Sequence, residues 1–233
     1  IKSSAASDVY KRQGTNRMNI YMVRKATQGL ANYLNKQGGK KSVAISYDSR
    51  IKSDVFAREA ARVLAGNGVK AYLYKELMPV PALSFATRHL HCDAGIMVTA
   101  SHNPAVYNGI KVFMEGGRDA DETLTAAFEG YIRELEGEPV ETVPYEEGLA
   151  AGSIQLIDPM NDYIDSILKM VDAEAIRSRG LHVVLDPMYG VSKTALQTIL
   201  LTTRCDVEVI HERRDTLFGG RLPAPNLLPL IHI

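Results

Sequence analysis

The residues whose types and spacing could do chemistry lie together between positions 99 and 111 of this 233-residue chain. Ser101 offers a hydroxyl, His102 stands beside it, and Lys111 follows ten positions after the serine. A hydroxyl with a base and a cation close by can act as a nucleophile. The alternative is that serine, asparagine and proline gather here only because they favour turns.

The sequence around Ser101 predicts a strand followed by a tight loop. Residues 94–98 are an uninterrupted apolar run, which is typical of a buried strand. Asn103-Pro104 and Asn108-Gly109 are strong turn signals. Since ligands of open α/β sheets bind outside the carboxyl ends of the strands, we expect Ser101 to be presented at such an end.

A second polar turn follows another predicted strand. Residues 42–47 form a short apolar run, and Asp48-Ser49-Arg50 comes directly after it. One interpretation is a charged turn in which Asp48 caps the backbone and pairs with Arg50. The other is that the planar guanidinium of Arg50 serves a phosphoryl group.

The string Thr99-Ala100-Ser101-His102-Asn103-Pro104, followed by Asn108-Gly109-Ile110-Lys111, resembles the phosphoserine loop of the α-D-phosphohexomutases. This is the phosphoglucomutase and phosphomannomutase family. The resemblance extends over residues 14–226. Gly14-Thr15-Asn16-Arg17 and Phe218-Gly219-Gly220-Arg221 are similar to the bacterial phosphoglucomutase branch rather than to phosphoglucosamine mutase.

The resemblance implies that Ser101 carries a phosphoryl group and, through that phosphate, contacts Mg²⁺. His102 and Lys111 become acid/base or phosphate-neutralising residues, a division that the sequence leaves open, and a solvated strand lysine is the plain alternative for Lys111. Arg50 is implied to stabilise the charge that develops during transfer. The residues expected to shape the loop are Asn103, Asn108 and Gly109.

The order of the predicted elements indicates an α/β fold with mixed, mostly parallel sheets and helices on both faces. The expected helices and strands of the first unit are 20–34, 42–47, 53–65, 69–74, 82–90, 94–98, 110–114 and 121–135, and those of the second are 160–171, 181–186, 192–200 and 205–210. We expect two consecutive α/β domains, the first two of the family's four. The predicted boundaries are a tail at 1–13, domain I at 14–137, an acidic linker at 138–155, domain II at 156–226 and a tail at 227–233.

Two motifs of the family have no counterpart in this sequence. The first is the Gly-Thr-x-Gly-x-Arg-Gly loop near the amino terminus, and Arg17 is better interpreted as a helix-entry residue than as a replacement for its arginine. The second is the Asp-Gly-Asp-x-Asp-Arg loop that holds magnesium in the third domain. We therefore expect an N-terminal two-domain fragment that does not turn over sugar phosphates alone.

Composition excludes some other classes of protein. Lys+Arg and Asp+Glu both number 27, so the chain has no excess of positive charge that would indicate binding to nucleic acid or to a membrane surface. Cys92 and Cys205 lack metal-ligand spacing and are interpreted as reduced core thiols, and His182 and His211 as structural histidines. No Gly-x-Gly-x-x-Gly follows a predicted strand, which disfavours a dinucleotide-binding protein.

The leading hypothesis is thus a cytoplasmic phosphohexomutase that interconverts hexose 1-phosphate and hexose 6-phosphate, with glucose as the preferred sugar. The resemblance implies Mg²⁺ as cofactor and a hexose 1,6-bisphosphate as the activating intermediate. The alternatives are a phosphomannomutase or dual-specificity mutase, and a non-catalytic fragment that binds phosphosugars.

Overall fold

The computed structural model describes residues 18–135 and 137–225. The tails expected at 1–13 and 227–233, and the expected role of Arg17, lie outside the described residues. No helix in the described part of the chain is both long and apolar enough to cross a membrane.

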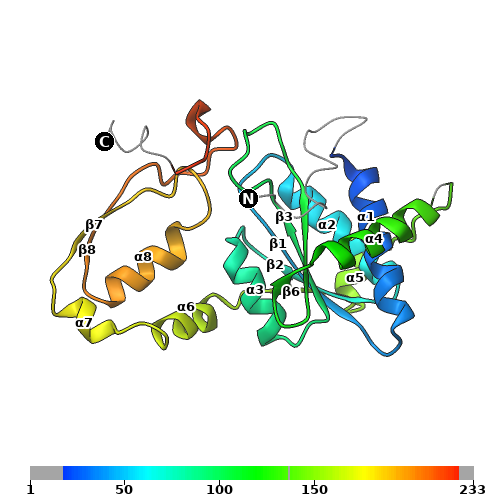
Figure 1. Cartoon of the computed structure of the whole chain (residues 1–233), viewed down its shortest axis with the longest axis horizontal. Helices are drawn as coiled ribbons and strands as arrows, with labels where there is room; N and C mark the ends of the chain where they lie inside the picture. Colours follow the sequence, from blue (N-terminus) through cyan, green and yellow to red (C-terminus); the bar gives the residue numbers. More distant parts are fainter. Residues whose placement is uncertain (1–17, 136, 226–233) are drawn as a thin grey trace.

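The first unit is a six-stranded sheet in the order β5-β4-β3-β1-β2-β6 (Figure 1). Its strands are β1 (Ser42–Tyr47), β2 (Lys70–Tyr74), β3 (Ala94–Val98), β4 (Ile110–Met114), β5 (Arg118–Asp119) and β6 (Ile154–Ile157). Strands β3, β1, β2 and β6 are parallel to one another, whereas β4 pairs antiparallel with β3 and β5 pairs antiparallel with β4. The predicted mixed, mostly parallel α/β architecture is confirmed.

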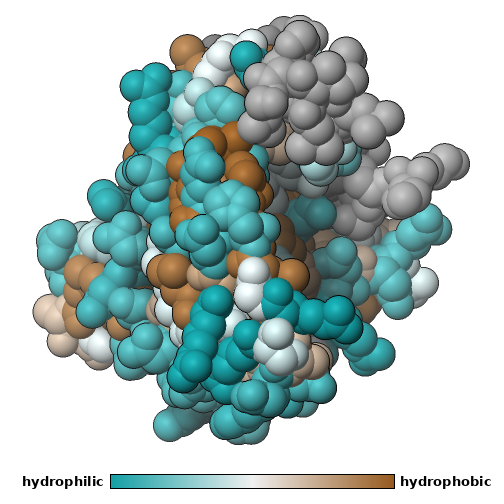
Figure 2. Space-filling model, turned by 90° about the vertical axis from the view of Figure 1, so that its left-hand side faces the viewer, coloured by the Kyte–Doolittle hydropathy of each residue, from teal (hydrophilic) through white to brown (hydrophobic). Residues whose placement is uncertain are grey.

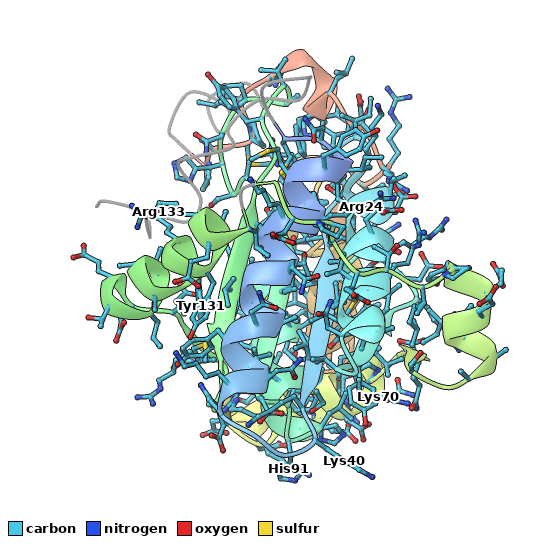
Figure 3. All side chains as sticks on the ribbon, turned by 90° about the vertical axis from the view of Figure 1, so that its right-hand side faces the viewer. Arg24, Lys40, Lys70, His91, Tyr131 and Arg133 are labelled. Atoms are coloured by element: carbon cyan, nitrogen blue, oxygen red, sulfur yellow. The ribbon has the colours of Figure 1, made fainter. Side chains whose placement is uncertain are left out.

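Helices cover both faces of this sheet. They are α1 (Ile20–Lys36), α2 (Ser53–Gly66), α3 (Val80–His89), α4 (Glu122–Glu134) and α5 (Tyr145–Ala150). Figure 3 shows α1 lying across the sheet between α2 and α4, and Arg24 of α1 reaches Glu59 of α2 at 2.6 Å. Helix α3 packs on the opposite face. Each face therefore has its own apolar core, and the sheet is buried on both sides.

The segment expected to be a linker differs from the prediction. Residues 138–155 include α5 and the start of β6, and β6 pairs in parallel with β2, with Ala71 opposite Ile154. Its acidic and glycine-rich composition indicated a solvated connector, but Ile154 and Ile157 are buried and complete the edge of the first sheet. Strand β6, of which Leu156 and Ile157 were assigned to domain II, thus belongs structurally to the first unit.

The second unit is smaller and contains a two-stranded parallel sheet. Its elements are α6 (Met160–Leu168), α7 (Ala173–Arg177), β7 (His182–Leu185), α8 (Lys193–Thr202) and β8 (Asp206–Val209), followed by the 3₁₀ turn η2 (Phe218–Gly220). Figure 2 views the molecule from this side, where apolar patches lie among polar ones. Leu181, Val184 and Leu201 are among the exposed apolar residues of this unit.

The two units share one apolar core on the α3 face of the large sheet. Tyr163 and Ile164 of α6 and Ile199 of α8 join Leu83 of α3 and Met97 of β3 in that core. Phe85 and Tyr163 face each other with ring centroids 5.6 Å apart. The second unit is therefore packed on the first rather than only tethered to it.

Candidate active site

Strand register brings the two predicted polar turns side by side. Strands β1 and β3 are direct neighbours, with Tyr47 opposite Val98, and the amide of Asp48 donates to the carbonyl of Val98 at 3.2 Å. The segment 48–50 therefore lies next to residues 99–109, which we call the serine loop. Both turns lie at the carboxyl edge of the sheet, where Ser101 was expected, and together they form the candidate site.

Ser101 is exposed and has a left-handed backbone, with φ of 54°. Such a conformation costs a non-glycine residue roughly 1–2 kcal/mol, so the surroundings must hold it. The Ser101 amide donates to Oγ1 of Thr99 at 3.0 Å, and its Oγ lies 3.3 Å from Nδ1 of His102. The Thr99 hydroxyl thus fixes the backbone of Ser101, while the Ser101 hydroxyl faces solvent beside the His102 imidazole. This arrangement suits a group that must exchange with a bound substrate.

Arg50 is fully buried beneath the serine loop and donates to four of its carbonyls. Nη1 donates to Pro104 at 2.9 Å and Tyr107 at 3.1 Å. Nη2 donates to Ser101 at 2.8 Å and Asn103 at 2.7 Å. The expectation that Arg50 stabilises the transferring charge directly is therefore corrected. Its Nη donors are already used by the loop, so it acts by shaping that loop.

Asp48 is the buried anion of this site. Its Oδ1 accepts from the Arg50 amide at 3.0 Å and from Ser53 Oγ at 2.9 Å. Its Oδ2 accepts from Thr99 Oγ1 at 2.6 Å and lies 3.2 Å from Arg50 Nε. Burial raises the pKa of Asp48, whereas the Thr99 hydrogen bond and the Arg50 charge oppose that rise. The carboxylate thus ties both turns and α2 to one point.

Asn103, Asn108 and Gly109 hold the two ends of the loop. Nδ2 of Asn103 donates to the carbonyl of Ala100 at 2.9 Å. Asn108 is fully buried, its Nδ2 donates to Ser53 Oγ at 2.9 Å, and its Oδ1 accepts from the Gly109 amide. Each amide satisfies nearby backbone or hydroxyl groups, and the loop is thereby closed on itself.

Lys111 lies just beyond the loop on β4, paired with Met97 of β3. It is half-buried, and no hydrogen bond or ion pair to its side-chain ammonium is found among residues 18–135 and 137–225. The structure therefore brings His102, Asn103, Asn108, Gly109 and Arg50 around Ser101 and places Lys111 on the adjoining strand.

Three residues of this site had no role predicted from the sequence. Thr99 was quoted only as part of the motif, Ser53 was only the first residue of the expected helix 53–65, and Phe218 was quoted only as part of the Phe218-Gly219-Gly220-Arg221 segment. The structure gives the α2 N-cap position to Lys52 and uses Ser53 to bridge Asp48 and Asn108. Phe218 places its ring 5.0 Å from Cζ of Arg50, a contact for which the sequence carries no signal.

The implied magnesium would need oxygen ligands close to Ser101. Over the described ranges, no three His, Cys, Asp or Glu side chains gather so that they could hold a metal ion. Asp48 is engaged by Thr99, Ser53 and Arg50. These residues do not by themselves fit a magnesium site, so no step is derived through the metal.

An apolar cavity of about 250 Å³ lies away from this site, between α1, α4 and the sheet. Leu30, Ile96, Val112 and Phe128 are among its lining residues. The serine loop contributes none of the lining. The candidate site is an exposed loop surface, not this cavity.

Comparison with protein families decides the assignment. Residues 2–138 match the profile of phosphoglucomutase/phosphomannomutase alpha/beta/alpha domain I, and residues 161–230 match that of domain II. The chain belongs to the phosphoglucomutase/phosphomannomutase family. This family is the α-D-phosphohexomutase family to which the serine loop pointed. The domain I match begins upstream of Gly14, where the resemblance in sequence was expected to start.

Individual relatives agree with the family assignment. A phosphoglucomutase of Staphylococcus saprophyticus is 36% identical over 214 residues, which are 90% of this chain and 38% of the relative. A Haemophilus influenzae protein described as a phosphomannomutase is 34% identical over 78% of this chain and 37% of its own length. A crystal structure from Thermus thermophilus, described as a phosphomannomutase, superposes with a TM-score of 0.81 at 26% identity. It covers 98% of this chain and 51% of that one, so the chain spans well under two thirds of these relatives.

Proposed function

We propose that this chain forms the phosphoserine-bearing half of a phosphohexomutase that interconverts hexose 1-phosphate and hexose 6-phosphate. The observation that carries the proposal is the exposed Ser101 hydroxyl on a loop whose carbonyls are clamped by buried Arg50. Membership of the family and relatives named as phosphoglucomutase and phosphomannomutase support the reaction class.

The chemistry assigned to the loop is a pair of phosphoryl transfers. In the first, the bond between phosphorus and Ser101 Oγ breaks, and a new bond forms to the free hydroxyl oxygen of a hexose monophosphate. The sugar hydroxyl loses its proton to a base, and Ser101 Oγ recovers a proton. The bisphosphate then returns its other phosphoryl group to Ser101, so the phosphate count balances. Such transfers depend mainly on positioning and electrostatic stabilisation.

We assign Ser101 as the phosphoryl carrier. His102 lies within 3.3 Å of it and is, with Lys111, a candidate for the acid/base or the phosphate-neutralising role. A phosphoserine carries about −1.5 to −2 charges at neutral pH, which both side chains could offset. We propose that Mg²⁺, which the family generally requires, takes ligands supplied outside the described residues in addition to the Ser101 phosphate.

Glucose phosphates are the proposed substrate pair, and a hexose 1,6-bisphosphate is the proposed activating intermediate. The Staphylococcus relatives are named phosphoglucomutases, whereas the Haemophilus relative favours mannose as the second candidate sugar. We place the protein in the reducing cytoplasm, where the buried free thiols Cys92 and Cys205 would persist unpaired.

The proposal is tested by measuring phosphorylation of Ser101. The complete enzyme, which we propose continues beyond this chain, is incubated with glucose 1,6-bisphosphate and Mg²⁺, and Ser101 is examined by intact mass and peptide mapping. We expect one added phosphoryl group on Ser101 and mutase activity that Ser101→Ala abolishes. The exposed Ser178→Ala is the matched control and should leave both unchanged. Full isomerisation by the Ser101→Ala enzyme would refute the proposal.

The 233-residue chain itself gives a second expectation. Since it lacks a metal-binding cluster among its described residues, we expect no turnover of glucose 1-phosphate in a coupled assay with Mg²⁺. Robust turnover by this chain would show that the catalytic site is complete within it.

A further inference from the structure

We infer that Phe218, from the segment that leaves the second α/β unit, is a positioning residue for the serine loop. It acts by capping the guanidinium face of Arg50. The inference concerns the geometry of the loop, and its catalytic meaning rests on the proposed phosphoryl transfer.

The serine loop binds the edge of the Arg50 guanidinium and leaves the flat faces of the group free. Its Nη donors point in the plane of the group toward four carbonyls of the serine loop. A flat cation bonded along its edge still exposes its faces. Phe218 places its ring under Cζ at 5.0 Å, within the range of a cation–π contact. Because Arg50 is fully buried, this attraction acts without competing water.

Phe218 is held in place by a dedicated turn. Asp215 accepts from the amide of Leu217 at 2.8 Å through Oδ1 and from the amide of Gly219 at 3.1 Å through Oδ2. The Phe218 amide donates to the Asp215 carbonyl at 3.1 Å. Phe218 itself has a φ of 54°, which a phenylalanine rarely adopts, and its two glycine neighbours on the carboxyl side are also left-handed. A side chain only 5% exposed in such a strained turn is fixed by what it packs against.

The turn is anchored in the second unit. A Cβ on Gly219 would lie 2.5 Å from the Tyr189 ring, so only glycine allows this approach. Tyr189 packs against the His211 ring at a centroid distance of 5.0 Å. His211 in turn lies 3.1 Å from Oδ2 of Asp186, at the end of β7. A continuous series of contacts therefore connects the end of β7, through η2, to Arg50 and the Ser101 carbonyl. The histidine expected to be structural is one of the links.

The consequence is that the second unit contributes to the geometry of a loop carried by the first. Without the ring, the Arg50 face would meet solvent, and its bonds to the loop carbonyls would compete with water. We expect the loop to open more often, while the sheet beneath it stays folded.

Amide hydrogen exchange in the 233-residue chain tests this inference without any substrate. The amides of Asn103 and Tyr107 report on the loop because each donates to a loop carbonyl, of Ala100 and Pro104 respectively. We expect Phe218→Leu to raise their exchange rates about tenfold, with no change in the amides of β1 and β2. Phe218→Tyr keeps the ring face and should restore slow exchange. Leu217→Ala, at an exposed neighbour in the same turn, is the matched control and should change neither set.

Two results of the exchange experiment would overturn the inference. One is unchanged loop exchange in Phe218→Leu. The other is acceleration of the loop and the sheet by the same factor, which would mean a purely structural role. A measurement on the unsubstituted chain covers the case in which Phe218→Leu does not fold. In that chain the ring current of Phe218 should shift the Arg50 Hε and Hδ resonances upfield. Unshifted resonances would also overturn the inference. Failure of Ser101 to accept phosphate would instead remove the proposed function and leave the exchange result standing.

Discussion

Arg50 shows how one residue can look catalytic in the sequence and act as a scaffold in the structure. A solvent-exposed arginine beside a phosphoserine would neutralise phosphate. Here the guanidinium is fully buried and its Nη groups bind four carbonyls at 2.7–3.1 Å. Only arginine offers this planar set of donors, so lysine is not an equivalent substitute.

Arg50→Lys is expected to lower the free energy of unfolding by about 3 kcal/mol. The ammonium cannot reach all four carbonyls and leaves the buried Asp48 with a poorer partner. Urea unfolding followed by circular dichroism measures the change. Arg118→Lys, at an exposed arginine on β5, should change stability by less than about 0.5 kcal/mol. Equal effects of the two substitutions would contradict the role of Arg50 in holding the serine loop.

Ser101→Gly separates backbone strain from the hydroxyl. Glycine adopts a φ of 54° without steric cost but gains more freedom when unfolded, so the two effects nearly cancel. We expect stability within about 1 kcal/mol of the unsubstituted chain. Phosphate incorporation should nevertheless be lost completely. Thermal unfolding and intact mass give both readouts, and a loss of several kcal/mol would show that Ser101 Oγ has a structural role.

At the scale of elements, the turn between α3 and β3 places a thiol in the apolar core. Cys92 is 1% exposed, and burial raises its pKa to about 11. The folded chain therefore binds this proton more tightly than the unfolded chain, whose thiol titrates near 9.0. The stabilisation is present below the unfolded pKa and is lost as pH rises through 9 to 11.

Cys92 should therefore resist alkylation in the folded chain at about pH 8, since it is both buried and protonated. Iodoacetamide labelling followed by peptide mapping measures the rate, with the urea-unfolded chain as the reference. We also expect the free energy of unfolding to fall between pH 9 and pH 11. Labelling of Cys92 at the same rate in folded and unfolded chains would show that this turn is open.

At the scale of the whole molecule, the two α/β units share a core through α3 and α6. Tyr163 is 9% exposed and packs against Phe85. The Phe218–Arg50 contact joins the same two units at the site. The units should therefore unfold together rather than as independent domains.

Tyr163→Ala tests this coupling. Removal of a buried ring should cost about 3 kcal/mol, and native-state hydrogen exchange should show the loss in β7 as well as in β1. Tyr21→Ala, at a tyrosine 71% exposed, is the control and should have little effect. Destabilisation confined to the second unit would indicate two separate folding units.

Much of the architecture could be predicted because it depends on local patterns. Apolar runs such as 42–47 and 94–98 are long enough to specify buried strands, and the Asn-Pro and Asn-Gly pairs specify turns by their own backbone preferences. Residues 138–155 could not be assigned in the same way. The four residues of β6 are too few to form a period, and their pairing with β2 is a property of the sheet.

The sequence by itself determined the longer helices and strands, which loop carries the serine and which family the loop resembles, because these depend on residue type and short spacing. Only the tertiary structure decided what Arg50 does. Its role depends on the register of β1 and β3, which places four carbonyls around its guanidinium, and on Phe218, which arrives from far along the chain. Contacts between distant segments follow from packing in three dimensions, which local residue preferences do not encode.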